Sequence, residues 1–179
     1  HRFERAGFMI MQLWGIHEFM VLNTCNRVEI IAGVSQETAE NGILRHIMGF
    51  TNLKEDKFYI KEGWGAFQHL CLTTAGMLSQ TPGENHITAQ MKEALESAKQ
   101  RGWAGNMTQE WISSALHVSK AIKNEVAPLL HSYEIEDLAL RYLEAHGKNL
   151  AESTLLVLGA GMIGKGLVND SLPKIGKII

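Results

Sequence analysis

The chain is organised around the stretch Val21-Leu22-Asn23-Thr24-Cys25-Asn26-Arg27-Val28-Glu29-Ile30-Ile31. Apolar residues at both ends of this stretch are typical of β-strands, and a polar insert with a thiol separates them. Amide and guanidinium groups in a buried strand would need hydrogen-bond partners, so Thr24–Arg27 is better explained as a turn or a strand end. The residues alone leave two interpretations open. Cys25 is either a reactive thiol or a small buried side chain that packs as a hydrophobe.

Length and composition indicate a globular protein of one domain or a little more. The chain has 179 residues, of which 45% are hydrophobic, enough for a sizeable core. Its formal charge of −2 predicts no strong nonspecific attraction to nucleic acid or anionic membranes. No apolar run approaches the roughly 18–20 residues of a membrane span, and the start has no signal-peptide pattern. Two cysteines make no disulfide framework, so we expect free thiols and a cytoplasmic protein with no membrane contact.

The first 75 or so residues predict an alternation of strands and helices. A short helix over Met9–Phe19 would precede the opening strand, and apolar spacing predicts a helix over Gln36–Phe50 with Ser35 as its N-cap. Phe58-Tyr59-Ile60 has the content of a short strand, and Trp64–Ala75 is expected to be helical. This order indicates a small α/β or α+β domain.

Three successive helices are predicted after a loop over Gly76–Gly83. Apolar side chains at helical spacing place them over Glu84–Arg101, Met107–Val126 and Ile135–Leu143, the last ended by His146-Gly147. Such apolar stripes are most simply core. We therefore interpret this region as a helical connector.

A continuously apolar run, Thr154–Leu158, follows the connector and is typical of a strand buried on both faces of a parallel sheet. Lys165–Ser171 can begin a helix, and Lys177–Ile179 would open another strand. One strand–helix unit and the root of a second strand cannot bury both faces of a Rossmann sheet. We therefore expect the sequence to be a fragment of a longer protein.

The pattern G-x-G-x-x-G lies between the predicted strand and helix, over Gly159–Gly164. The pattern is weak alone, but this context predicts dinucleotide binding. Gly159 permits a tight turn, Gly161 lets the backbone approach a pyrophosphate, and Gly164 lets helix and strand pack closely. The helix N-terminal amides would then meet the anion.

A cysteine turn and a nicotinamide site together suggest thioester redox chemistry. A thiolate attacks an activated acyl group, and hydride from the cofactor reduces the thioester to an aldehyde. Arg27 would favour the thiolate of Cys25. Cys71 is the competing nucleophile, but it stands in an apolar helical stretch and is interpreted as core.

Three blocks of the chain resemble the glutamyl-tRNA reductase family, whose enzyme starts the five-carbon route to tetrapyrroles. Thr24–Ile30 is similar to the family motif T-C-N-R-x-E. A second block resembles H-L-F-x-V-x-x-G-L-D-S-x-x-x-G-E-x-Q-I-x-G-Q-V-K, and the glycine-rich segment lies at a compatible distance downstream. Without a gap, the second block is matched by His69, Leu70, Gly76, Ser79, Gly83, Glu84, Ile87, Gln90 and Lys92.

The resemblance implies a role for each matched residue. Cys25 would be the nucleophile that takes the glutamyl group from tRNA as a thioester, and His69 would transfer a proton or place the substrate. Arg27 would bind a carboxylate region of the substrate, and Glu84 its ammonium. The substrate-binding residues would be Thr24, Asn26, Arg27, Ser79, Glu84, Asn85, His86 and Gln90, and the cofactor-binding residues Gly159, Ala160, Gly161, Met162, Ile163 and Gly164.

Several positions differ from the family pattern. The family's L-D-S is Met77-Leu78-Ser79 here, its Gln after G-E-x is His86, and the glycine before Gln90 is Ala89. The basic segment R-V-R-T-E-T corresponds to Ala121–Val126, with little of its charge. The family's first strand and its C-terminal dimerisation helix have no counterpart in this sequence.

The sequence therefore predicts an α/β chain of two parts. Residues 1–147 would form an α+β catalytic and substrate-recognition domain, with the helical connector from about 84. Residues 148–179 would be the start of a Rossmann NAD(P)-binding domain. The resemblance implies NADPH-dependent reduction of glutamyl-tRNA(Glu) to glutamate-1-semialdehyde, a homodimer in the full-length protein, and glutamate-1-semialdehyde aminomutase as a partner. No metal site is expected.

Two other functions stay open from the residues. One is an NAD(P)-dependent oxidoreductase that acts on a different acyl or aldehyde substrate, which a requirement for charged tRNA would exclude. The other is a non-catalytic tRNA-binding or regulatory paralogue, suggested by Leu78 and the altered basic segment. Tight tRNA binding without turnover would favour it.

Overall fold

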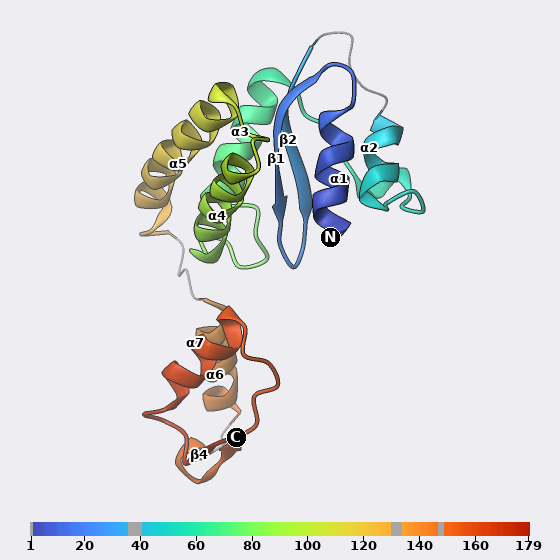
Figure 1. Cartoon of the computed structure of the whole chain (residues 1–179). Helices are drawn as coiled ribbons and strands as arrows, with labels where there is room; N and C mark the ends of the chain where they lie inside the picture. The colour runs from blue at the N-terminus through green and yellow to red at the C-terminus, as the bar shows by residue number, and fades with distance from the viewer. Residues whose placement is uncertain (1, 36–40, 130–133, 147–148) are drawn as a thin grey trace.

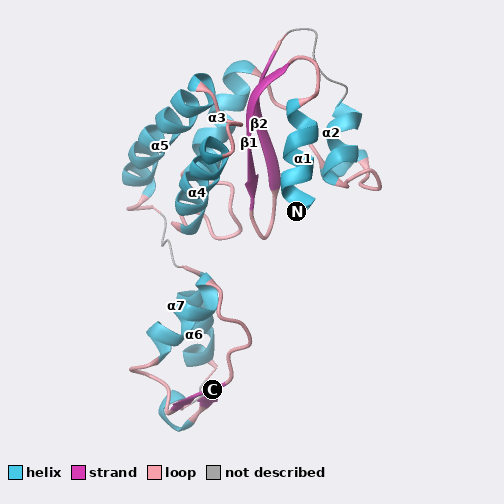
Figure 2. Ribbon diagram, viewed as in Figure 1, coloured by secondary structure: helices cyan, strands magenta, loops and turns pink. Residues whose placement is uncertain are grey.

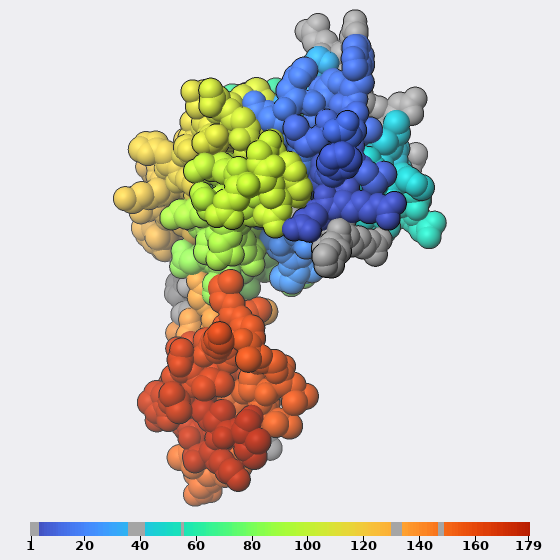
Figure 3. Space-filling view, in the orientation of Figure 1, coloured from blue at the N-terminus to red at the C-terminus, as the bar shows by residue number. Residues whose placement is uncertain are grey.

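The computed structural model describes residues 2–35, 41–129, 134–146 and 149–179. Figure 1 shows the chain as two parts, a larger one built from residues 2–129 and a smaller one built from residues 134–179. In the space-filling view of Figure 3 the two parts meet over a narrow waist. Helix α6 (Ile135–Ala145) packs on α7 (Met162–Ser171) within the smaller part, and the functional boundary placed at residue 147 stays a prediction.

A β-hairpin forms the centre of the larger part. Strand β1 spans Ile16–Asn23 and pairs antiparallel with β2, Val28–Val34. Four consecutive residues of β1, Phe19–Leu22, are buried. Burial on both faces follows from the arrangement in Figure 2, where helices cover the hairpin on either side.

In the described part of the chain, five helices surround this hairpin: α1 Arg2–Met11, α2 Asn41–Met48, α3 Gly63–Thr74, α4 His86–Gln100 and α5 Asn106–Val126. Helices α1 and α2 lie on one side of the hairpin, and α3, α4 and α5 lie on the other (Figure 1). The bounds of α3, α4 and α5 agree closely with the three helices predicted for this region from the sequence.

Two predictions for the N-terminal region are wrong. The helix expected over Met9–Phe19 lies earlier, at Arg2–Met11, because the chain turns through Gly15 (φ 85°) and continues as β1. Phe58-Tyr59-Ile60 is not a strand but follows a 3₁₀ turn, Glu55–Lys57. Its aromatic and β-branched residues pair with no strand in the described part of the chain, and Tyr59 bonds to side chains of the hairpin and α3 instead.

The helix predicted over Gln36–Phe50 is confirmed only as α2. Residues 36–40 lie outside the described residues, and α2 begins at Asn41. Ser35 belongs to the hairpin end, where its N–H donates to the carbonyl of Gly15 at 2.9 Å. Ser35 therefore does not cap the described helix.

The core of the larger part lies between β1 and helices α3–α5. Met91 and Ile112, both with no exposed surface, pack there with Phe19. The ring of Phe19 stacks on Trp103 with centroids 5.1 Å apart, and its N–H donates to the Trp103 carbonyl at 2.8 Å. The turn between α4 and α5 is thereby fixed against the hairpin.

The smaller part contains α6 (Ile135–Ala145), β3 (Thr154–Leu155), α7 (Met162–Ser171) and β4 (Lys177–Ile178), with a 3₁₀ turn at Leu150–Glu152. Strands β3 and β4 are parallel, and α7 connects them and packs on α6. This is a βαβ unit. Its extension into a Rossmann domain stays a prediction.

The strand predicted over Thr154–Leu158 is shorter and less buried than expected. Strand β3 covers only Thr154 and Leu155, although the Val157 N–H also donates to the Ile179 carbonyl at 2.9 Å, and Leu158 is 88% exposed. A strand hidden on both faces needs neighbours and helices on each side, whereas β3 pairs with β4 alone among the described residues. Gly147, predicted to end α6 together with His146, lies outside the described residues.

None of the helices in the described part of the chain combines the length and apolar character that crossing a bilayer requires.

We predict opposite effects for alanine at two helical glycines. A Cβ at Gly7 would overlap the indole ring of Trp103, which is buried and stacked on Phe19, whereas a Cβ at Gly65 meets no atom within 4 Å. Gly7→Ala should lower the free energy of unfolding by about 1–3 kcal/mol through overpacking. Gly65→Ala should leave it unchanged or raise it by up to about 1 kcal/mol.

Urea denaturation followed by circular dichroism measures both effects. A Gly7→Ala protein as stable as Gly65→Ala would contradict the packing of α1 against Trp103.

Candidate active site

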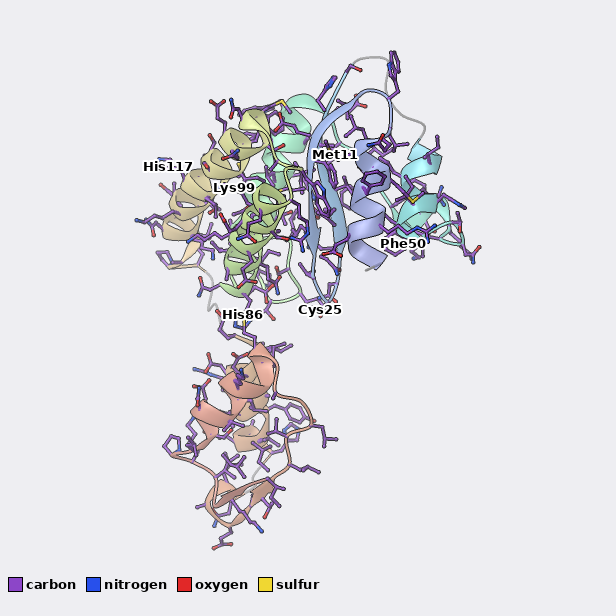
Figure 4. The ribbon with its side chains drawn as sticks, viewed as in Figure 1. Met11, Cys25, Phe50, His86, Lys99 and His117 are labelled. Carbon is purple, nitrogen blue, oxygen red and sulfur yellow. The ribbon has the colours of Figure 1, made fainter. Side chains whose placement is uncertain are left out.

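The turn between β1 and β2 is organised by Thr24. Its N–H donates to the Arg27 carbonyl at 2.9 Å. Its Oγ1 accepts from the N–H groups of Asn26 at 3.3 Å and Arg27 at 3.2 Å. These bonds leave Cys25 exposed at the hairpin tip, on the side that faces α6 and α7 in Figure 4. The structure thus has the predicted turn with an accessible thiol.

Arg27 ties this turn to the helical layer. One guanidinium nitrogen lies 3.2 Å from Glu29 Oε1 and 3.2 Å from Thr73 Oγ1 of α3. The other donates to the carbonyl of Leu78 in the loop after α3. The side chain is only 19% exposed, so Arg27 fixes the position of the turn as well as supplying positive charge near it.

Glu29 is the centre of a hydrogen-bonded cluster behind the turn. Its Oε1 accepts from the hydroxyl of Tyr59 at 2.7 Å and lies 3.1 Å from Nε2 of His69. That nitrogen is also 3.0 Å from the Tyr59 hydroxyl and 3.4 Å from Thr73 Oγ1. A carboxylate beside a ring nitrogen fixes the imidazole orientation and favours the proton on that nitrogen. His69 is therefore held rigidly on α3.

Tyr59 acts in this cluster as a hydrogen-bond donor. Burial raises the pKa of its phenol, and the neighbouring Glu29 carboxylate raises the pKa further. The phenol thus stays protonated near neutral pH and donates to Glu29.

Three cluster members were missed from the sequence. Glu29 stands in the T-C-N-R-x-E motif itself, which is a usable signal. Thr73 follows His69 by four positions on α3 and so lies on the same helical face. Tyr59 had no such signal, because its segment was assigned to a strand.

A second wall is formed by the start of α4 and the loop before it. Gly76 (φ 77°) and Gly83 (φ 90°) have backbone conformations that favour glycine, and they fold the loop back on itself. A Cβ on Gly76 would lie 2.6 Å from the Glu84 carbonyl oxygen. The loop therefore delivers Ser79 and Glu84 to the same side as the hairpin turn.

Lys123 of α5 holds the start of α4 in place. Its Nζ donates to the Glu84 carbonyl at 3.2 Å, Asn85 Oδ1 at 3.0 Å and Thr88 Oγ1 at 2.9 Å. Burial lowers the pKa of Lys123, although the charges of Glu134 and Glu84 oppose this shift. The surviving lysine of the altered basic segment is thus a structural anchor.

Two of the three glycines in the glycine-rich segment stand where a larger residue would be strained or would overlap a neighbour. Gly159 has φ 119°, a conformation that side chains rarely adopt. A Cβ on Gly164 would overlap the carbonyl oxygen of Gly159, so α7 packs directly on the turn. Gly161 is the N-cap of α7, and a Cβ there meets no atom within 4 Å. The space beside Gly161 is open at a helix N-terminus, which suits an anionic group.

These segments share one cleft of about 530 Å³. The hairpin turn lines one side, the start of α4 another, and the glycine-rich segment the third. The lining residues are Thr24, Cys25, Asn26, Arg27, Ser79, Glu84, His86, Ile87, Gln90, Leu156, Val157, Leu158, Gly159, Gly161, Met162, Ile163, Gly164 and Leu167.

Three predicted site residues do not line the cleft. His69 lies in the cluster around Glu29. Asn85 bonds to Glu134 and Lys123. Ala160 belongs to the glycine-rich segment without lining the cleft.

The fold and the cleft define a protein of mixed helix and sheet in which a cysteine-bearing hairpin turn shares a cleft with a glycine-rich loop at a helix N-terminus. Comparison with known proteins agrees with this class. A family model described as the N-terminal domain of glutamyl-tRNAGlu reductase matches residues 3–126. The chain belongs to the glutamyl-tRNA reductase family.

Relatives named glutamyl-tRNA reductase, which is the name of an oxidoreductase, come from several organisms. The protein of Akkermansia muciniphila is 28% identical over 169 residues, covering 92% of this chain and 50% of the relative. That of Aquifex aeolicus is 30% identical over 156 residues, covering 86% and 38%. The solved structure of glutamyl-tRNA reductase from Methanopyrus kandleri shares the fold, with a TM-score of 0.63 and 24% identity over 98% of this chain and 42% of that one. The chain spans half or less of these proteins.

We predict that the two thiols react at very different rates. Cys25 is exposed, whereas Cys71 is only 5% exposed and burial raises the pKa of its thiol. Ellman's reagent should therefore modify Cys25 at least roughly ten-fold faster than Cys71, because the thiolate is the reacting form. Cys25→Ser should abolish the fast phase, and Cys71→Ser, the matched control, should retain it. A fast phase that survives in Cys25→Ser would contradict the assignment.

Proposed function

We propose that the protein reduces glutamyl-tRNA(Glu) to glutamate-1-semialdehyde with NADPH, through a thioester on Cys25, as a step in tetrapyrrole biosynthesis. One observation carries the proposal. The thiol turn, the start of α4 and the glycine-rich segment line a single cleft. In this proposal residues 1–147 recognise and bind the substrate, and residues 148–179 begin the NADPH-binding domain.

The first step is acyl transfer to Cys25. Its thiolate attacks the ester carbonyl of glutamyl-tRNA, a carbon–sulfur bond forms, and the bond to the terminal ribose oxygen breaks. The released oxygen takes a proton. Cys25 at an exposed hairpin tip suits this step, because the ester is at the end of a large molecule and must reach the thiol.

The polar residues of the cleft would bind the glutamyl group. Glu84 would pair with the substrate ammonium, and Arg27 would bind a carboxylate through its charged fork. Thr24, Asn26, Ser79, His86 and Gln90 line the same cleft and would add hydrogen bonds. Asn85 would act indirectly, since its side chain holds the start of α4 against Lys123 and Glu134.

His69 is proposed as a positioning residue. It contacts Glu29, which pairs with Arg27, so it acts on the turn through two side chains. This arrangement supports placement of the substrate over direct proton transfer to it.

The glycine-rich segment fits a dinucleotide. The amides at the start of α7 would hold the pyrophosphate, and the open space at Gly161 would admit it. When bound, NADPH supplies the hydride that converts the thioester to the aldehyde. The choice of NADPH over NADH rests on the family, as do a homodimer and glutamate-1-semialdehyde aminomutase as a partner.

We predict that glutamyl-tRNA labels Cys25. The protein at its full natural length, incubated with radiolabelled glutamyl-tRNA and no NADPH, should gain one glutamyl group that hydroxylamine releases. Cys25→Ser should lose this label by more than about 10²-fold, since serine lacks a comparably reactive anion. Cys71→Ser is the control and should label normally.

The outcomes separate the competing functions. A protein that binds glutamyl-tRNA tightly and is never labelled would be a non-catalytic paralogue. Labelling by free glutamyl thioesters with charged tRNA inert would assign another acyl substrate.

A further inference from the structure

We propose that Glu84, His86 and Glu134 bind a divalent transition-metal ion where the start of α4 meets the start of α6. Each residue offers one ligand atom, and these atoms all lie within 4.8 Å of one another. Glu84 and His86 flank the N-cap of α4, and Glu134 is the N-cap of α6. The ion would join the larger part of the protein to the smaller one.

The carboxylate of Glu134 is oriented for this role. Its Oε1 accepts from both the backbone N–H and the side-chain Nδ2 of Asn85, each at 3.0 Å. Its Oε2 is buried and has no hydrogen-bond partner in the described part of the chain. That oxygen lies 3.6 Å from Nδ1 of His86, too long for a hydrogen bond. A cation between the two atoms would satisfy both.

Glu136 is an independent indication of a ligand at this site. Its side chain is only 8% exposed, and its Oε2 finds no hydrogen-bond partner among the described residues. Its Oε1 lies 3.8 Å from Nε2 of His86 and against Gly166 of α7, where a side chain would not fit. A buried carboxylate oxygen without a hydrogen-bond partner is costly.

A metal ion would account for Glu136. A histidine that ligates a metal through one ring nitrogen usually donates its other N–H to a carboxylate. With Nδ1 of His86 on the ion, Nε2–H would face Glu136. Glu136 would then orient the ligand rather than bind the ion itself.

The local charge also suits a cation. Three carboxylates, those of Glu84, Glu134 and Glu136, gather at this point. Lys123 lies close, but the three hydrogens of its ammonium are accounted for by a carbonyl, an amide oxygen and a hydroxyl. One imidazole and two carboxylates suit Zn²⁺, Mn²⁺ or Co²⁺, whereas Ca²⁺ prefers oxygen ligands alone.

The inference goes beyond the proposed function and does not depend on it. Glu84 and His86 line the cleft, so an ion there would lie in its wall and fasten α4 to α6. With the ion bound, both ring nitrogens of His86 would be used and His86 would line the cleft without bonding the substrate, whereas the second oxygen of Glu84 would stay available for the substrate ammonium. Sequence spacing does not predict the site, because Glu134 and Glu136 are far from His86 along the chain.

Titration of the metal-free protein with Co²⁺, followed by its visible absorption and by equilibrium dialysis, tests the site. One Co²⁺ should bind per chain, without a thiolate-to-cobalt charge-transfer band. Glu134→Gln keeps the acceptor for Asn85 and removes one charged ligand oxygen, and His86→Gln removes the imidazole. Each should weaken binding by at least about ten-fold, equivalent to about 1.4 kcal/mol. Glu93→Gln and His117→Gln, on exposed positions of α4 and α5, are the matched controls and should bind like the parent.

Three results would overturn the site. The first is no binding at millimolar Co²⁺, which would leave an ion-pair cluster only. The second is binding that survives in both ligand variants. The third is a charge-transfer band that disappears in Cys25→Ser. The assay uses neither tRNA nor NADPH, so its failure is distinct from failure of the proposed function. Circular dichroism shows whether each variant is folded.

Discussion

The buried carboxylate of Glu29 is the interaction on which the candidate site depends. It pairs with Arg27 of the hairpin turn and contacts Tyr59 and His69, so it joins the turn to α3. The side chain of Glu29 is only 9% exposed, and burying a carboxylate without such partners is costly. Because all these groups share Oε1, a change in one would move the others. The accessible thiol of Cys25 is thus presented on a rigid base, as a nucleophile requires.

The cleft depends in turn on contacts between the two parts of the chain. Asn85 and His86 at the start of α4 meet Glu134 and Glu136 at the start of α6, and α7 packs on α6. These contacts set the glycine-rich segment across from the hairpin turn. Polar contacts of this kind are less permanent than an apolar core and are compatible with movement between domains. An ion at this junction would make the arrangement stiffer.

Much of the fold and of the candidate site could be predicted from the sequence, and the predictions that failed did so for physical reasons. Apolar spacing located α4–α6 because each helix buries one stripe, and the polar insert at Thr24–Arg27 indicated a turn because those side chains need partners. The prediction of a helix over Met9–Phe19 was wrong because helices cover β1 on both sides (Figure 2). Both faces of the strand are then apolar, and the alternation of apolar and polar residues that marks a strand is absent. Motifs found the cleft residues, whereas Tyr59 and Glu134 act through contacts between distant segments that no local pattern records.

The central claim is that the thiol of Cys25 and a dinucleotide on the glycine-rich segment work in one cleft. The most direct measurement begins with the isolated glutamyl adduct of Cys25, free of tRNA, to which NADPH is added. The account predicts that the adduct disappears as an equal amount of glutamate-1-semialdehyde forms. It also predicts that the adduct persists in Gly161→Ala, whose added methyl group occupies the open space at the start of α7. A parent adduct that survives saturating NADPH would contradict the account.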